Sequence, residues 1–307
     1  MLIEAKNVSK WYGDVIALNT FSLEVGPGIT GVVGPNGAGK STFFRMILGL
    51  IRPSKGYVLV KGQNPWSNPE LMGEIGYLPD HDILPDNISG YDYLSLTGGL
   101  RGLDRWELEE RIQKVSHQVD MIPLLDRKIN GYSKGMRQRL KIAGAMIHDP
   151  SLLVLDEPLS GTDPTVRKSI FEIIESLRKD GKDVIISSHV LHDIERVTKN
   201  VVLLYRGRSV ACGTISEIRS LLNQFPHTMV IDCKDPRQVA RDLMVHDWVR
   251  SVDIDPGGEL LVRVNEPKMF HERFSKMVVD NGYDIGEVYI KDEDLESIFR
   301  YMMGGRL

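Results

Sequence analysis

The sequence contains few cysteines and no long hydrophobic run. Its 307 residues include two cysteines, Cys212 and Cys233, which excludes a framework of disulfide bonds and fits a reducing compartment. No stretch of about eighteen consecutive apolar residues occurs, and residues 1–10 lack the apolar core of a signal peptide. The sequence therefore predicts a cytosolic chain without a signal peptide or a transmembrane segment. Any action at a membrane would require a second chain that spans it.

An excess of basic residues is also absent. The formal net charge of −4 and the pI near 6.1 argue against a general nucleic-acid-binding protein, which normally carries a basic face. One basic cluster, Arg137, Arg139 and Lys141, falls within a predicted helix. We interpret this cluster as a solvated helix face rather than as a nucleic-acid contact. The length allows one large α/β domain and a smaller second domain.

Residues 34–42 read Gly-Pro-Asn-Gly-Ala-Gly-Lys-Ser-Thr, which matches the P-loop pattern. In such a loop the backbone N–H groups surround phosphate oxygens and the lysine neutralises their charge. A β-branched run at residues 29–33 precedes the loop and an apolar helical stretch at residues 42–50 follows it, so the helix N-terminus would face the phosphates. We predict a nucleoside triphosphate site in which Lys40 reaches the β and γ phosphates and Ser41 ligates Mg²⁺. Its other predicted residues are Gly34, Asn36, Gly37, Ala38, Gly39 and Thr42.

Strand and helix patterns alternate over the first two thirds of the chain. Residues 2–23 alternate polar and apolar side chains around a Tyr-Gly break and predict a β-ribbon. Helical patterns from about residue 86 to 147 predict a helical subdomain, in which Asp104 caps an amphipathic helix over residues 104–121. Later strands alternate with helices, which predicts a parallel sheet. These elements are strands at 56–62, 152–155, 184–187 and 201–205 and a helix at 166–179.

The last part of the chain has a different pattern. Strands at 228–233, 249–254, 259–264 and 285–290 and helices at 236–245 and 267–280 give the order βαββαβ. We predict a small α+β domain of the ferredoxin-like type over residues 223–307, closed by a helix at 294–302. The preceding domain would comprise residues 1–222.

Two carboxylates follow the buried strand at residues 152–155. Ligands sit at the carboxyl ends of the strands in a parallel sheet, so Asp156 and Glu157 would lie beside the P-loop. Asp156 then suits the Mg²⁺ shell, and Glu157 suits the orientation or deprotonation of an attacking water. An acid in this position can alternatively serve only to cap the following helix.

One short motif resembles the signature of a known family. Residues 132–139 read Tyr-Ser-Lys-Gly-Met-Arg-Gln-Arg, which resembles the signature sequence of ATP-binding cassette (ABC) ATPases. The usual form is Leu-Ser-Gly-Gly-Gln, so Ser133 and Gly135 match it while Tyr132, Lys134 and Met136 depart. This variant resembles exporters of the drug-resistance and sodium-extrusion type, as does the final Asp-Leu-Glu-Ser-Ile-Phe-Arg run. The resemblance covers residues 1–220 with strong motifs.

Other elements of the family occur in the family's order. By resemblance Tyr12 stacks on adenine, with Trp11 as a rival, residues 160–163 form the D-loop, and His189 is the switch histidine. His189 and His192 have helical spacing, but no third ligand nearby supports zinc. The family normally has glutamine where this sequence has Asp80, which can still ligate Mg²⁺.

The resemblance implies an α/β P-loop NTPase fold of the cassette type, with a β-ribbon subdomain, a parallel sheet core and a helical subdomain. It implies an ATPase whose catalytic residues are Glu157, His189 and Lys40. By the same resemblance, Ser41, Asp156 and Asp80 would bind Mg²⁺. Ser133 and Gly135 would contact ATP on a second cassette, in a homodimer or with a sister chain. The expected partner is a membrane-spanning permease on a separate chain, at the cytoplasmic face of the cell membrane, and the expected direction is export. No direct nucleic-acid contact is expected.

Two other functions remain open from the sequence. One is a non-transport ABC ATPase that acts on ribosomes or nucleic-acid complexes, although no long coiled coil separates the P-loop from the signature. The other is a nucleotide-sensing interaction module that binds ATP without turnover. The presence of Glu157 argues against the module, because a protein that does not hydrolyse ATP needs no glutamate to position water.

Overall fold

The computed structural model describes residues 1–222 and 227–290 and divides the chain into two compact units. The first unit is Met1–Thr214 and the second is Ile215–Leu307. The predicted division after residue 222 lies at the end of helix α8 (Ile215–Leu222), whereas the structure divides the chain before this helix.

A three-stranded antiparallel sheet begins the first unit. It consists of β1 (Ile3–Tyr12), β2 (Val15–Val25) and β4 (Lys55–Val60), in the order β2-β1-β4, which confirms the predicted ribbon. The inner face of this sheet packs on α1 (Lys40–Ile47), where the rings of Phe21 and Phe43 meet edge to face with their centroids 4.9 Å apart. Aromatic pairs of this geometry add to the burial of apolar area. The packing fixes the helix that follows the P-loop.

A six-stranded sheet forms the centre of this unit. Its order is β5-β6-β7-β3-β8-β9, and all neighbours are parallel except β8 and β9. Strands β3 and β6 are buried along their whole length, as expected for strands covered on both faces. The carboxyl ends of β3, β6 and β7 therefore meet at one edge. The strands are β3 (Ile29–Val33), β5 (Ile75–Leu78), β6 (Leu152–Leu155), β7 (Asp183–Ser188), β8 (Asn200–Tyr205) and β9 (Arg208–Thr214).

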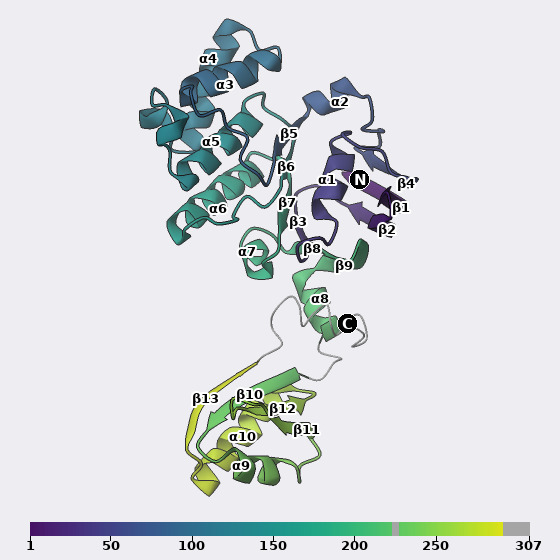
Figure 1. Cartoon of the computed structure of the whole chain (residues 1–307), viewed down its shortest axis with the longest axis vertical. Helices are drawn as coiled ribbons and strands as arrows, with labels where there is room; N and C mark the ends of the chain where they lie inside the picture. Colours follow the sequence, from purple (N-terminus) through teal and green to yellow (C-terminus); the bar gives the residue numbers. More distant parts are fainter. Residues whose placement is uncertain (223–226, 291–307) are drawn as a thin grey trace. The chain divides into compact units, whose positions relative to one another are not determined.

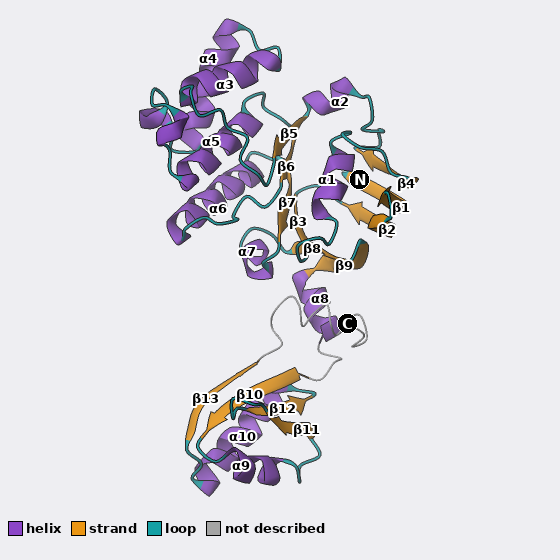
Figure 2. Cartoon of the chain, in the orientation of Figure 1, coloured by secondary structure: helices purple, strands orange, loops and turns teal. Residues whose placement is uncertain are grey.

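Helices cover both faces of this sheet (Figures 1 and 2). Helix α1 lies between the two sheets, and α5 (Lys134–Met146) and α6 (Pro164–Lys179) lie on the other side of the central sheet. Two short helices, α2 (Pro69–Gly73) and α7 (Leu191–Glu195), follow β4 and β7. The predicted helix at 42–50 is α1, which begins two residues earlier and stops before Gly49, whose φ of 62° is left-handed.

The helical subdomain consists of α3 (Gly90–Leu100), α4 (Arg105–Gln118) and α5, with 3₁₀ turns at Ile122–Leu124 and Ile129–Gly131. Asp104 caps α4 as predicted, because its Oδ1 accepts hydrogen bonds from the N–H groups of Trp106 and Glu107 at 2.9 Å. The buried side of α4 includes Ile112 and Val115. The predicted amphipathic helix is confirmed, with its last turn ending at Gln118 rather than at residue 121.

The prediction of a solvated basic face on α5 is wrong. Lys141 is 6% exposed, and the side chain of Arg137 is 18% exposed and forms two ion pairs. Arg139 donates to the backbone carbonyls of Val119 and Asp120 at 3.5 and 3.4 Å. The three cations contact carboxylates and backbone carbonyl groups of the segments that pack around α5. This arrangement is a property of the tertiary structure that a helical charge pattern does not reveal.

His148 gives the first unit a pH-dependent stability. Its Nε2 donates to the carbonyl oxygen of Ile75 at 3.2 Å. Burial, with a smaller effect of the Arg101 charge, lowers its pKa from 6.5 to about 4. The unfolded chain therefore binds more protons than the folded chain between these values, so stability is full above about pH 6.5 and falls as the pH approaches 4.

We expect His148→Gln to lose this component of the pH dependence. The urea midpoint of the unmodified protein should fall more than that of the variant between about pH 7.5 and pH 5. His117→Gln, at an exposed position, is the control and should behave like the unmodified protein. If the urea midpoint decreased equally in the His148→Gln variant and in the unmodified protein, this explanation would be wrong.

The second unit contains a four-stranded antiparallel sheet in the order β11-β12-β10-β13. Phe270 and Phe274 of α10 stack at 5.1 Å, and with Val239 and Leu243 of α9 they cover one face of this sheet. The βαββαβ order is confirmed, and the ferredoxin-like assignment stays a prediction. The predicted helix at 294–302 lies outside the described residues. The elements are β10 (His227–Cys233), α9 (Pro236–Leu243), β11 (Val249–Ile254), β12 (Leu260–Val264), α10 (Pro267–Asn281) and β13 (Ile285–Ile290).

Candidate functional site

The P-loop connects β3 to α1 at the carboxyl edge of the central sheet. A Cβ atom at Gly34 would collide with the carbonyl oxygen of Leu204, so the backbone there needs glycine. Gly39, which precedes α1, has a φ of 108°, and a Cβ there would lie 2.7 Å from the carbonyl oxygen of Ala17. The exposed part of the loop is Asn36 and Gly37, while Ala38 is buried. The loop thus turns tightly and leaves the N-terminus of α1, with Ser41 and Thr42, at the site.

Lys40, Glu157 and His189 meet at this edge, as the sequence predicts. The Lys40 ammonium group is 6% exposed and donates to the carbonyl oxygen of Gly34 at 2.6 Å. It also lies 3.1 Å from Oε1 of Glu157, while Nδ1 of His189 lies 2.9 Å from Oε2 of the same carboxylate. Oε1 is buried and accepts no hydrogen bond from the described residues, so its contact with Lys40 is an ion pair only. A buried acceptor in this state can take a hydrogen bond from a water molecule.

The backbone at Glu157 is held in an uncommon conformation. Its φ is 49°, and its N–H donates to Oγ of Ser187 at 2.8 Å. The Ser187 hydroxyl in turn donates to Oδ1 of Asp156 at 2.6 Å. A non-glycine residue with positive φ costs free energy that its surroundings must offset. Ser187 was not among the predicted site residues, although it contacts the Asp156 carboxylate and the backbone of Glu157.

Asp156 lies almost wholly buried in a negative environment. It is 1% exposed, and burial raises its pKa, opposed by hydrogen bonds from Ser187 and Ser41. The charges of Asp80 and Glu157 raise the pKa further, which shows that three carboxylates share this edge. A cation placed among them would favour the ionised forms.

These residues fit a magnesium ion that also binds phosphate. In the described part of the chain no three His, Cys, Asp or Glu side chains are grouped so that they could hold a metal by themselves. Ser41 and Asp156 would supply two oxygen ligands, and Mg²⁺ commonly takes its remaining ligands from phosphates and water. Asp80 is exposed, and its Oδ1 lies 2.7 Å from Nδ1 of His81, so its predicted metal role stays a prediction.

Tyr12 and Trp11 lie at the tip of the β1–β2 ribbon. Their exposed fractions are 43% and 36%, and a lysine ammonium lies over each ring, Lys10 at 5.4 Å from Tyr12 and Lys55 at 5.6 Å from Trp11. The ribbon approaches the P-loop, because Ala17 of β2 lies against Gly39. The geometry allows either ring to stack on an adenine base.

Ser133 and Gly135 lie at the N-terminus of α5, in the helical subdomain. Ser133 is exposed and caps the helix, with its Oγ accepting from the N–H of Met136 at 3.3 Å. Gly135 is buried, and a Cβ there would collide with Cγ2 of Val166 on α6. Packing within the chain is therefore a second reason for glycine at this position, beyond the predicted approach to a phosphate. The buried Gln138, which the sequence did not single out, donates to the carbonyl oxygen of Pro158 at 2.7 Å and ties α5 to the strand end.

Comparison with known proteins agrees with this geometry. The family model described as ABC transporter matches residues 18–160. The Nod factor export ATP-binding protein I of Cupriavidus metallidurans is 35% identical over 219 residues, which cover 71% of this chain and 72% of that protein. This chain belongs to the family of ABC transporter ATP-binding proteins. It is therefore an ATP-binding protein and an ATPase, and the predicted family is confirmed.

Two further matches show which part of the chain resembles ABC transporter proteins. The bacitracin transport ATP-binding protein BcrA of Bacillus licheniformis is 27% identical over 307 residues, 99% of this chain and 98% of that protein. A solved ATP-binding subunit of an ABC transporter matches with a TM-score of 0.65 at 29% identity, covering 72% of this chain and 93% of that structure. The match to this structure confirms the cassette fold. The match to BcrA extends over almost the whole chain and therefore includes the second unit.

Proposed function

We propose that this chain is the ATP-hydrolysing subunit of an ABC exporter, which dimerises on Mg-ATP and drives a separate membrane-spanning permease. One observation carries the proposal: Glu157 lies between Lys40 and His189 with a buried oxygen that accepts no hydrogen bond from the described residues. A protein that only senses ATP would not need this carboxylate. A relative named for Nod factor export supports export as the direction.

The chemistry begins with water held at Oε1 of Glu157. The carboxylate orients this water and takes its proton as the oxygen attacks the γ-phosphorus, whose bond to the β,γ-bridging oxygen breaks so that ADP leaves. Lys40, already directed at the P-loop carbonyl of Gly34, turns its ammonium to the β and γ phosphates. His189, with a proton on each ring nitrogen, donates from Nδ1 to Glu157 across the 2.9 Å contact and from Nε2 to the transferred phosphoryl group. Mg²⁺ held by Ser41 and Asp156 would offset the phosphate charge.

A second cassette completes the site in this proposal. Ser133 is exposed at the N-terminus of α5, where its hydroxyl and the helix N–H groups can meet the γ-phosphate held by another chain. ATP then lies between two chains and stabilises the dimer, and hydrolysis removes that stabilisation. Motion of the helical subdomain would transmit the change to the permease.

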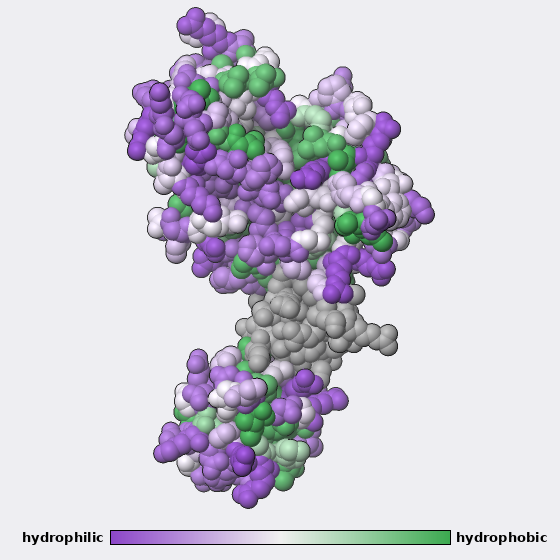
Figure 3. Space-filling view, in the orientation of Figure 1, coloured by the Kyte–Doolittle hydropathy of each residue, from purple (hydrophilic) through white to green (hydrophobic). Residues whose placement is uncertain are grey.

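Exposed apolar side chains on the helical subdomain support a permease partner. Leu96 and Leu100 share one face of α3 and are 55% and 80% exposed, and Trp106 at the start of α4 is 88% exposed. Figure 3 shows apolar residues gathered in the region of α3 and α4. Large apolar groups clustered at a surface mark an interaction site. Within the described residues no helix is both long and apolar enough to cross a bilayer. The proposal assigns the membrane span to a partner chain.

Replacing exposed apolar residues of this surface by glutamate tests the proposal. We expect Leu100→Glu with Trp106→Glu to move the protein from the membrane fraction of its native cells to the soluble fraction. Its thermal midpoint should change little, because both positions are exposed and such substitutions cost within about 0.5 kcal/mol. Leu50→Glu is the matched control, since Leu50 is 59% exposed and lies just after α1. Membrane recovery of the double variant equal to that of Leu50→Glu would count against docking through this surface.

A further inference from the structure

The segment 79–86, between β5 and α3, begins at the nucleotide edge of the central sheet. It carries Asp80, whose charge acts on Asp156, and it forms neither helix nor strand. The segment ends near Asp86, whose carbonyl oxygen accepts from the N–H of Asn130 at 3.1 Å. Its position therefore depends on contacts with neighbouring elements rather than on a regular backbone.

Arg137 of α5 supplies most of these contacts. Its guanidinium group forms ion pairs with Asp82 and with Asp86, the latter at 2.7 Å. It also donates to the carbonyl oxygens of Leu84 at 3.3 Å and Ile129 at 3.2 Å. Burial opposes ionisation of Asp82, but the hydrogen bonds from Arg137 and from the N–H of Leu84 lower its pKa overall. One planar guanidinium thus joins three residues of the segment to the first turn of α5.

Lys141 reinforces the same connection one helical turn later. It lies four residues after Arg137 on the same side of α5 and is 6% exposed. Its ammonium group lies 3.5 Å from the carbonyl oxygen of Pro79 and 3.4 Å from that of His81, the residues on either side of Asp80. The backbone around Asp80 is therefore fixed to α5 and not to the sheet alone.

The N-terminus of the same helix carries Ser133. Four residues separate Ser133 from Arg137, and the N–H of Arg137 donates to the carbonyl oxygen of Ser133 at 2.9 Å. Gly135 packs on Val166, and Gln138 holds the carbonyl group of Pro158, next to Glu157. Helix α5 therefore contacts the elements that carry Asp80 and Glu157 while it presents Ser133 to the exterior.

We propose that Arg137 is a positioning residue, which makes the Asp80 segment in one nucleotide site move together with the Ser133 helix end that serves the other site. This inference rests on the proposed function, because it requires two sites that share α5. Arg137 would act through Asp82 and Asp86 and would touch neither nucleotide. Its loss would leave ATP binding in the P-loop intact while weakening the closure of the dimer.

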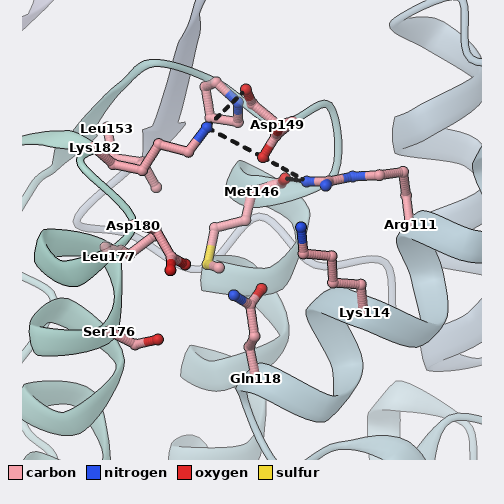
Figure 4. Close-up of a pocket in the computed structure, with 11 residues that line it drawn as sticks. Arg111, Lys114, Gln118, Met146, Asp149, Leu153, Ser176, Leu177, Asp180 and Lys182 are labelled. Carbon is pink, nitrogen blue, oxygen red and sulfur yellow. Dashed lines mark hydrogen bonds and ion pairs between the residues drawn. The ribbon is translucent and has the colours of Figure 1, made fainter.

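Arg137→Lys tests this inference, with Arg111→Lys as a matched control. Arg111 is also a helix arginine of low exposure, 12% against 18%, and it joins one carboxylate and two carbonyl groups, where Arg137 joins two of each. Its partners are Asp149, Met146 and Ile147, at the opposite end of α5. Figure 4 shows Arg111 with Asp149 and Met146. A lysine cannot reproduce either fork of hydrogen bonds. The two variants should therefore lose similar stability and differ only in function.

We expect Arg137→Lys to lower kcat about tenfold to a hundredfold with KM for ATP changed by less than about twofold, because misplaced catalytic groups lower turnover. In a Glu157→Gln background it should raise the dissociation constant of the ATP-bound dimer by a similar factor. Arg111→Lys should change neither quantity by more than about twofold. Asp82→Asn should lower kcat as Arg137→Lys does, and the double variant should add little, because the two residues form one interaction.

Equal kcat values for Arg137→Lys and Arg111→Lys, or full additivity with Asp82→Asn, would overturn the inference. If Arg137→Lys does not fold, Asp82→Asn alone decides by the same kcat and KM values. The unmodified protein separates the two proposals. A protein that neither hydrolyses ATP nor dimerises would refute the proposed function, whereas an active dimer that is indifferent to Arg137 would refute only this inference.

Discussion

Glu157→Gln lowers the turnover number for ATP about a thousandfold, which is the size of effect expected for the loss of a general base. The amide keeps the shape of the side chain and can still contact His189, but it cannot accept the proton of the attacking water. Its neutral charge also removes a repulsion toward the phosphates, so ATP affinity should be kept or increased. Phosphate release and nucleotide binding, measured on the same preparation, separate these two effects.

The same variant should accumulate as an ATP-bound dimer, because the step that opens the interface is blocked. Sedimentation velocity with and without Mg-ATP measures this directly. Glu74→Gln is the matched control, since Glu74 also pairs with a lysine but lies 48% exposed, at the start of β5. Turnover within about tenfold of the unmodified protein would show that Glu157 is not the base. A variant that stays monomeric in Mg-ATP would contradict the dimer.

Lys40→Met should weaken ATP binding about a hundredfold and lower turnover about a hundredfold to a thousandfold, as the loss of a preorganised donor to developing charge does. The methionine fills a similar volume but brings no charge to the β and γ phosphates. It also leaves the Glu157 carboxylate, 13% exposed, without its cation, so we expect a lower free energy of unfolding as well.

Titration calorimetry with ATP measures the first effect, and urea unfolding measures the second. Lys61→Met controls for the loss of a lysine that pairs with a glutamate, because Lys61 pairs with Glu74 away from the P-loop. We expect that control to bind ATP normally. Unchanged ATP affinity in Lys40→Met would mean that the loop binds phosphate by its backbone alone and that the predicted role of Lys40 is wrong.

Most of the site residues were predicted from short sequence motifs. The P-loop, Asp156, Glu157 and His189 each follow a recognisable strand, and the structure brings all of them to one edge. Ser187 was missed because its contact with Glu157 spans thirty residues and depends on the parallel pairing of β6 with β7. A signal did exist, since two serines end an otherwise apolar, buried strand.

Long-range contacts explain where the sequence misled. The cations of α5 were interpreted as a solvated helix face, yet Lys141 is buried against the carbonyl groups of the segment 79–86. No local pattern shows that a loop some sixty residues earlier turns its carbonyl groups toward this helix. The start of α1 was also placed too late, because Gly39 in a left-handed conformation ends the loop directly before Lys40. Tertiary structure decided both features.

The central claim is that this ATPase drives a membrane-spanning partner. The most direct test is affinity isolation of the Glu157→Gln protein, in Mg-ATP, from detergent-solubilised membranes of its native cells, followed by identification of the recovered proteins. The account predicts a polytopic membrane protein that is lost when Leu100 and Trp106 are replaced by glutamate. Recovery of ribosomes, nucleic acid or soluble proteins alone would contradict it and would favour a non-transport ABC ATPase.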